Sequence, residues 1–97
     1  MHIIKTKTLK EFYLKHADAK NDIIAWIDIA QGAEWKSFGD LQQLFPYLSL
    51  LKNNRMVFNI GGNKYRLMVK FIFITKTVYI RFIGTRAEYD KINANTI

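Results

Sequence analysis

The sequence predicts an α+β fold: an N-terminal strand and a helical hairpin packed on one face of an antiparallel sheet, followed by a short C-terminal helix. Three observations predict it. Apolar residues recur at helical spacing through the first half of the chain. From residue 55 onward, apolar and polar residues alternate in three runs separated by short turn signals. With 97 residues, the chain can bury one hydrophobic core, so we expect a single domain over residues 1–97.

The N-terminal elements begin with a short apolar run, residues 2–5, which we interpret as the first strand. Thr8 and Glu11 then have the spacing of a capping box, with Thr8 as the N-cap of a first helix. His16 is interpreted as an ordinary residue at the end of this helix. The apolar face of the helix is formed by Leu9, Phe12 and Tyr13.

A second helix is expected to start at Asp18, which can cap it, and to end at Gly32 in a left-handed conformation. Its apolar face repeats at three and four residues, through Ile23, Trp26, Ile27 and Ala30. The two helices are predicted to form a hairpin with an apolar seam.

Ser37 and Asp40 repeat the capping pattern ahead of a short third helix, which Pro46 ends. Its apolar residues are Leu41, Leu44 and Phe45. Trp35 lies in the connection before this helix and is interpreted as part of the core rather than as a platform for stacking bases.

The three alternating runs predict a meander whose register follows from its turns. The turn 61–64 pairs Ile60 with Tyr65, which places Asn59 opposite Arg66 and Arg55 opposite Lys70. A second turn, 74–77, pairs Phe73 with Val78, so that Val69 faces Phe82 and Lys70 faces Arg81. One face of the sheet is then apolar and suited to covering by the helices.

The positive charge of the chain belongs to its second half. The formal net charge is +7. Nine basic and two acidic residues follow Leu51, whereas six of each precede Lys52. The polar face of the predicted sheet gathers Arg55, Asn59, Arg66, Lys70 and Arg81, with Arg86 just past the last strand. Like charges on neighbouring strands repel, which indicates a surface for a polyanion. The alternative is a solvated face with gatekeeper lysines.

Several function classes are excluded or disfavoured by composition. The chain has no cysteine, and its two histidines, His2 and His16, lie outside the basic half, so no metal or cofactor is expected. No Ser–His or Cys–His pair for nucleophilic catalysis and no phosphate-binding glycine motif is present; Gly61-Gly62 is interpreted as a hairpin turn. No apolar run approaches the roughly 20 residues of a membrane span, and no signal peptide is recognised, so we expect a cytoplasmic protein.

The remaining basic and aromatic residues fit metal-free cleavage of RNA, in which fixed arginines stabilise charge on the phosphate as the 2′-hydroxyl attacks it. Proton transfer would then depend on Tyr89, Lys64 or Asp90. Their ordinary pKa values of roughly 10, 10.4 and 3.9 lie far from neutrality. Neighbouring cations are expected to lower the pKa of the tyrosine or the lysine.

Two long segments, VFNIGGNKYRLMVK and VYIRFIGTRAEYDKI, closely resemble the HigB family of bacterial toxins within the RelE-like group. The N-terminal LKEF and the stretch AEWKSFGDL extend this resemblance over essentially the whole chain. The resemblance implies helices packed on an antiparallel sheet. It also implies an endoribonuclease that cuts translated mRNA on the ribosome and is held inactive by a HigA-like helix-turn-helix antitoxin.

The resemblance also assigns residues. Arg66 matches the arginine that RelE-like toxins place at the scissile phosphate, and Arg86 and Tyr89 match a terminal basic and aromatic pair. HigB-like sequences often have histidine where this chain has Arg86, which leaves the acid and the base open. The expected catalytic residues are Arg66, Arg81, Arg86, Tyr89 and Lys64. The expected RNA contacts are Arg55, Asn59, Lys70, Asp90 and Lys91.

A second function from another class stays open, because RelE-like folds also include ParE-like gyrase poisons that cleave nothing. The chain would then be a non-catalytic module that blocks the ribosome or DNA gyrase. The concentration of arginines beside a tyrosine at the end of the sheet favours catalysis over simple docking.

Overall fold

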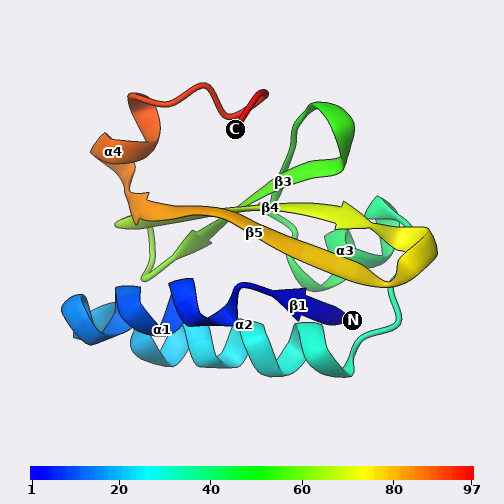
Figure 1. Ribbon diagram of the computed structural model, residues 1–97, viewed down its shortest axis with the longest axis horizontal. Helices are drawn as coiled ribbons and strands as arrows, with labels where there is room; N and C mark the ends of the chain where they lie inside the picture. The colour runs from blue at the N-terminus through cyan, green and yellow to red at the C-terminus, as the bar shows by residue number, and fades with distance from the viewer.

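A five-stranded mixed sheet separates two long helices from the C-terminal end of the chain in the computed structural model, which describes residues 1–97 (Figure 1). The strand order is β1-β5-β4-β3-β2. The strands are β1 (His2–Ile4), β2 (Ser49–Leu50), β3 (Arg55–Ile60), β4 (Tyr65–Ile72) and β5 (Thr77–Thr85). The α-helices are α1 (Thr6–Lys15), α2 (Lys20–Gly32), α3 (Phe38–Leu44) and α4 (Arg86–Asp90). Short 3₁₀ turns span Ala17–Ala19, Lys52–Asn54 and Phe73–Thr75.

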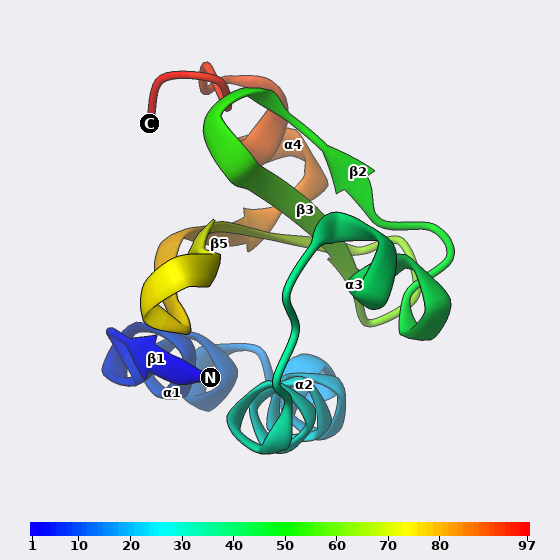
Figure 2. The ribbon, with the colours of Figure 1, turned by 90° about the vertical axis from the view of Figure 1, so that its right-hand side faces the viewer.

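The predicted α+β fold class is confirmed, but the sheet is not wholly antiparallel. β1 pairs with β5 in parallel, because α1 and α2 intervene before the chain enters the rest of the sheet. The edge strand β2, which was not predicted, pairs with β3. Helices α1 and α2 cover one face of the sheet, and α4 lies on the other (Figures 1 and 2).

The core lies between the helices and the apolar face of the sheet. It is one cluster of 18 buried residues. Each large apolar side chain of such a core contributes about 1.5–3 kcal/mol to the stability of the fold when it is fully buried. Trp35 is confirmed as a core residue, since it is 6% exposed and its ring meets those of Phe45 and Phe71 edge to face. Side chains with no exposed surface include Leu9, Ile23, Leu41, Leu67, Val69 and Phe71.

The predicted helices are present, but their ends differ from the predicted capping. α1 starts at Thr6 because the chain reverses at Lys5 (φ 75°), so Thr8 is not its N-cap. Gly32 ends α2 without left-handed geometry. The carbonyl groups at this end instead accept hydrogen bonds from the Met1 ammonium group, at 3.0 Å for Ala30 and 2.8 Å for Ala33. A cation at a helix C-terminus is favourable.

Of the two other predicted caps, the one at Asp18 is wrong, and the one at Ser37 is confirmed in position but not in its hydrogen bond. Asp18 caps no helix, because it lies in the 3₁₀ turn before α2 and its carboxylate binds side chains of the sheet. Ser37 is the N-cap residue of α3, but its side chain makes no capping hydrogen bond. Asp40 Oδ2 instead accepts a hydrogen bond from the backbone N–H of Lys36, at 3.0 Å.

The predicted register of β3 against β4 is confirmed, including Asn59 opposite Arg66 and Arg55 opposite Lys70. The predicted register of β4 against β5 is wrong. The connecting turn uses Phe73–Thr75 with Lys76 in the left-handed conformation, so Ile72 pairs with Thr77.

A bulge then interrupts the alternation along β5. Val69 pairs with Ile80 and Met68 with Phe82, which leaves Arg81 as the extra residue. Ile83 therefore pairs with Leu67 and packs against the core. The bulge keeps Arg81 exposed. The register predicted from the sequence was chosen for the same reason, because a slip by one residue would have buried Arg81 in the apolar face.

The second face of the sheet is not the open polar surface that the alternation predicts. Val57 and Met68, both on this face, are buried. α4 and residues 91–97 lie over this face of the sheet (Figure 1). Arg55 is only 8% exposed, and its Nε donates a hydrogen bond to the carbonyl oxygen of Ile97 at 2.8 Å. The prediction that Arg55 lies on an open surface is therefore wrong.

Candidate active site

The β3–β4 hairpin carries Lys64 and Arg66, and two carboxylates from the helical layer hold it. Gly61 and Gly62 have φ of 61° and 71°, a left-handed turn that glycine adopts without strain. The N–H of Gly61 donates to Asp22 Oδ2 at 2.8 Å. The turn is thereby fixed to α2, although 39 residues separate the two groups in the sequence.

The side chain of Arg66 projects from this hairpin on the sheet face opposite the core. Its Nη1 donates to the carbonyl oxygens of Asn63 and Tyr65, at 3.1 and 3.2 Å. The side chain is half-buried, and these two bonds orient the guanidinium plane while Nη2 and Nε bind no protein atom. A planar, partly desolvated guanidinium with free donors is suited to binding a phosphate in a two-pronged manner.

α4 brings an aromatic hydroxyl to the same place. Thr85 caps this helix in a full capping box: its hydroxyl accepts from the N–H of Glu88, and the Glu88 carboxylate accepts from the N–H of Thr85. These bonds hold the pKa of Glu88 below its ordinary value. The N–H of Arg86 donates to the carbonyl oxygen of Lys64 at 3.0 Å, which ties the start of α4 to the hairpin.

Tyr89 lies half-buried on α4, with its ring centroid 6.1 Å from that of Phe82. Burial raises the pKa of its hydroxyl above 10.0, although the nearby Arg66 charge acts in the opposite direction. The expectation that neighbouring cations lower the pKa of this tyrosine is therefore wrong, because desolvation is the larger effect. At neutral pH the Tyr89 hydroxyl is therefore protonated.

Lys64 is directed away from Arg66, toward the helical side of the sheet. Its Nζ forms an ion pair with Asp18 Oδ2 at 3.1 Å. Asp18 Oδ1 accepts a second hydrogen bond from the hydroxyl of Tyr65, at 2.7 Å. These bonds lower the pKa of Asp18, the Tyr65 bond most, and the same contact raises the pKa of Tyr65. Lys64 thus reinforces the hairpin, and its predicted catalytic role stays a prediction.

The remaining predicted site residues fall into separate groups. Lys70 lies four residues along β4 from Arg66, a distance of about 13 Å in a strand. It is half-buried and pairs with Arg55 and Tyr79. Arg81, at the bulge, places its guanidinium carbon 5.7 Å from the centroid of the Tyr79 ring.

Nearer to Arg66, the exposed Asn59 donates from Nδ2 to Asn63 Oδ1 at 3.2 Å. Asp90 and Lys91 are exposed at the end of α4. Tyr89 therefore lies close enough to Arg66 for the arginine charge to act on its hydroxyl, and the backbone of Arg86 is tied to the hairpin. Arg55, Lys70 and Arg81 lie farther along the sheet.

Several supporting residues were missed in the sequence. The pattern Thr85-x-x-Glu88 is a capping box that could have been found by the spacing rule applied to Thr8 and Glu11. No local signal predicts that Asp18 and Asp22 bind the hairpin, because each contact joins residues far apart in the sequence. No group of three or more His, Cys, Asp or Glu side chains in residues 1–97 is placed to hold a metal ion.

Helices α1 and α2 thus cover one face of a mixed sheet, and α4, which carries Tyr89, lies on the other. The family model for the HigB toxin, the RelE-like toxic component of a toxin-antitoxin system, matches residues 19–92. The chain belongs to this family. No helix has both the length and the hydropathy needed to cross a membrane.

Curated relatives agree with this assignment. The mRNA interferase toxin HigB of Escherichia coli K12 is 32% identical over 96 residues, covering 97% of this chain and 92% of the relative. The mRNA interferase HigB of Shigella flexneri has the same identity and coverage. The protein of the same name from E. coli O6:H1 is 26% identical over 95% of the chain and 91% of its own length.

Proposed function

We propose that this protein is a toxin that inhibits translation by cutting mRNA as ribosomes read it. Its relatives are named mRNA interferases, and the chain aligns with them over nearly its full length. The observation that carries the proposal is that Arg66 lies near enough to Tyr89 for its charge to act on the pKa of the Tyr89 hydroxyl. The first is a half-buried cation held by two backbone carbonyls, and the second is a hydroxyl whose raised pKa keeps it protonated.

In the proposed reaction, the ribose 2′-oxygen forms a bond to the adjacent phosphorus and the bond to the 5′-oxygen breaks. The 2′-hydroxyl loses its proton to solvent, and the departing 5′-oxygen gains one from Tyr89. Arg66 binds the phosphate oxygens on which negative charge accumulates, and Arg86 adds positive charge beside it. Because arginines supply this stabilisation, we propose that cleavage needs no divalent metal ion.

The proposed partners follow the same assignment. The exposed basic residues Arg81 and Lys91, together with Lys70, are proposed to bind mRNA and ribosomal RNA through phosphates. A HigA-like helix-turn-helix antitoxin is proposed to hold the toxin inactive in the cytoplasm. The family assignment supports an antitoxin partner, since the matching model describes the toxic component of a toxin-antitoxin system.

The test is to induce the chain in cells and map the 5′ ends of transcripts, with the Arg66→Lys variant as the matched control. Discrete new ends within reading frames, absent from the control, are the expected result. Growth arrest with intact transcripts and damaged DNA would instead identify a gyrase poison. In a purified translation reaction, cleavage should continue when EDTA is added together with a metal-free ribosome-stabilising polyamine.

A further inference from the structure

The strands of the sheet contain no aspartate or glutamate, whereas β3, β4 and β5 all carry lysine or arginine. Away from Arg66, two of these cations lie beside an aromatic ring on the second face. Tyr79 on β5 is the strand partner of Lys70 on β4. The guanidinium carbon of Arg81 is 5.7 Å from the centroid of the Tyr79 ring. These three residues, Lys70, Tyr79 and Arg81, form the Tyr79 cluster.

The Tyr79 cluster is accessible to a ligand. Arg81 is exposed, and Lys70 and Tyr79 are half-buried. The two ion pairs of the chain lie elsewhere, one on α1 and the other between the helical layer and the β3–β4 hairpin. The two cations of the cluster are therefore free to bind an anion that lies against the tyrosine ring.

The bulge in β5 extends this cluster toward the candidate active site. Strict alternation after Tyr79 and Arg81 would turn Phe82 to the core side. The extra residue at the bulge instead places Phe82 opposite Met68, on the second face. The Phe82 ring is half-buried there, and its centroid is 6.1 Å from that of Tyr89.

Gly84 makes room for the Phe82 ring beside Arg66. Gly84 is the strand partner of Arg66. A Cβ atom at Gly84 would lie 2.6 Å from Cζ of Phe82, so the ring occupies the space that a side chain would fill. Aromatic rings and cations thus follow one another along β5, from the Tyr79 cluster past Phe82 to Tyr89.

This arrangement matches the chemistry of single-stranded RNA. Unpaired bases stack on aromatic rings and on guanidinium planes, while lysine and arginine contact the phosphates. Arg81 and Tyr79 offer such a stacking surface, and Lys70 adds a point charge for a phosphate. An acidic peptide would use the charges but has no base for the ring. Lys70 lies about 13 Å along β4 from Arg66, which exceeds the length of one nucleotide.

We propose that Tyr79 and Arg81 form a base-stacking subsite for a further nucleotide of the mRNA, with Lys70 on the neighbouring phosphate. The proposal rests on the proposed function, which supplies the mRNA. The continuity of aromatic rings along β5 to Tyr89 assigns the ligand to the strand that is cut, rather than to ribosomal RNA. The subsite holds that strand at a second point and so helps to place the reacting phosphate at Arg66.

Abasic nucleotides test the subsite, because they keep the ribose and the phosphate but have no base to stack. Each mRNA in the purified translation reaction carries one abasic nucleotide near the cut. At one position beyond the nucleotides that flank the cut, loss of the base should lower kcat/KM of the wild type about tenfold. Tyr79→Leu should lower kcat/KM for the unmodified mRNA by a similar factor and should lose nothing further on that abasic mRNA.

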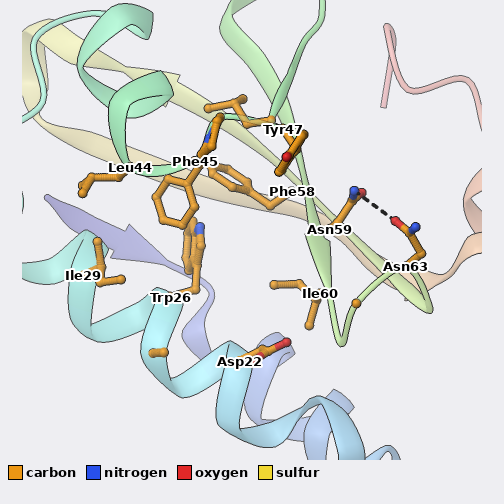
Figure 3. A pocket seen from close by; sticks show the side chains of 14 residues that line it. Asp22, Trp26, Ile29, Leu44, Phe45, Tyr47, Phe58, Asn59, Ile60 and Asn63 are labelled. Carbon is orange, nitrogen blue, oxygen red and sulfur yellow. Dashed lines mark hydrogen bonds between the residues drawn. The ribbon is translucent and has the colours of Figure 1, made fainter.

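The matched control is Tyr47→Leu, which removes the same ring elsewhere. Tyr47 is 86% exposed and borders an apolar groove between α2, the link from α3 to β2, and β3 (Figure 3). This variant should respond to the abasic nucleotide as the wild type does. Tyr79→Phe keeps a ring at the subsite and should restore the response that Tyr79→Leu loses.

Arg81→Lys tests stacking at a side chain that is exposed, so the result does not depend on how well Tyr79→Leu folds. Lysine keeps the charge but has no guanidinium plane. The variant should lose most of the response to the abasic nucleotide, while the salt dependence of cleavage stays the same. An undiminished response in Arg81→Lys and Tyr79→Leu overturns the proposal.

Other outcomes separate the subsite from the function on which it rests. A loss of ribosome association in Tyr79→Leu would assign the ring to ribosomal RNA. A loss of antitoxin binding with normal cleavage would assign it to a protein partner; either result overturns the proposal. If the wild type cleaves no mRNA, the proposed function and the subsite both fall. If it cleaves and no abasic position beyond the cut matters, only the subsite falls.

Discussion

Arg66 combines partial burial with an orientation fixed by the backbone. Both of its intramolecular hydrogen bonds use Nη1, so the rest of the guanidinium faces outward from the hairpin. Arg66→Lys keeps the charge but loses the planar fork, and removing one preorganised donor typically costs about 10²–10³ in rate. We expect transcript cleavage to fall by that factor while ribosome and antitoxin binding persist. A fully toxic Arg66→Lys variant would shift the catalytic role to Arg86 and Arg81.

Tyr89 provides a prediction about pH. Burial raises its pKa above 10.0, so the hydroxyl is protonated throughout the neutral range, and its contribution as a donor is lost only as pH rises through the raised pKa. Tyr89→Phe should therefore slow cleavage by about 10²–10⁴, by the same factor at every pH from neutrality to 9. Cleavage rates of both proteins over this range check it. A wild-type rate that climbs with pH and a variant rate that does not would make Tyr89 a base.

α4 depends on its capping box, since it is only five residues long. Thr85→Ala removes the side-chain cap, which typically costs about 0.5–2 kcal/mol, and should loosen the helix that carries Tyr89. The rate at saturating RNA should fall while the KM for RNA changes little. Thr85→Ser keeps a capping hydroxyl and is the control. Equal activity of the alanine and serine variants would mean that the cap does not position Tyr89.

The hairpin is fixed to the helical layer by an acid-sensitive contact. Hydrogen bonds from Tyr65 and Lys64 lower the pKa of Asp18 below its ordinary 3.8. A carboxyl with a lowered pKa adds stability above pH 3.8, and that stability is lost as pH falls through the lowered value. Asp18→Asn should reduce the free energy of unfolding at neutral pH.

The difference between the wild type and Asp18→Asn should shrink in acid, below pH 3.8. Urea unfolding at both pH values measures it. Asp28→Asn is the control, because Asp28 is exposed on α2 and makes no side-chain hydrogen bond. A difference that stays constant with pH would show that the Asp18 contact contributes through packing and not through its charge.

Across the whole molecule, the positive charge gathers on the half that forms the sheet, but part of that charge is engaged internally. Arg55 is buried against the carbonyl of Ile97, and Lys64 is paired with Asp18. Lys70, Arg81 and Lys91 remain for electrostatic binding. Association with the ribosome should therefore weaken steeply as salt rises, because phosphate contacts release counterions.

Lys70→Ala should weaken ribosome association and reduce the salt slope by about one, with little effect on folding. Lys7→Ala is the matched control: it changes the charge equally, but Lys7 lies on α1 and pairs with Glu11 at 3.7 Å. Sedimentation with ribosomes over a salt series compares the two. Equal slopes would place the RNA contact elsewhere on the chain.

Local pattern was enough to predict much of this protein. The alternation of β3 and β4 and the glycine turn between them determined their register, because a slip by one residue would turn every core side chain outward. The three helices of the first half followed from apolar spacing. Trp35, in a connection without such spacing, was correctly interpreted as part of the core. Arg66 and Tyr89 were found as candidates because they match family motifs, and the structure brings them together.

Tertiary structure decided the rest, because it depends on contacts between residues distant in sequence. The turn between β4 and β5 sets a strand register that differs by one residue from the register beyond Met68. The bulge at Arg81 accommodates this difference. Arg55 is buried by a C-terminal segment 42 residues away, and Asp18 finds its partner Tyr65 across 47 residues. The pKa of Tyr89 rises because partial burial disfavours the charged form of its hydroxyl, which no count of neighbouring charges in the sequence can show.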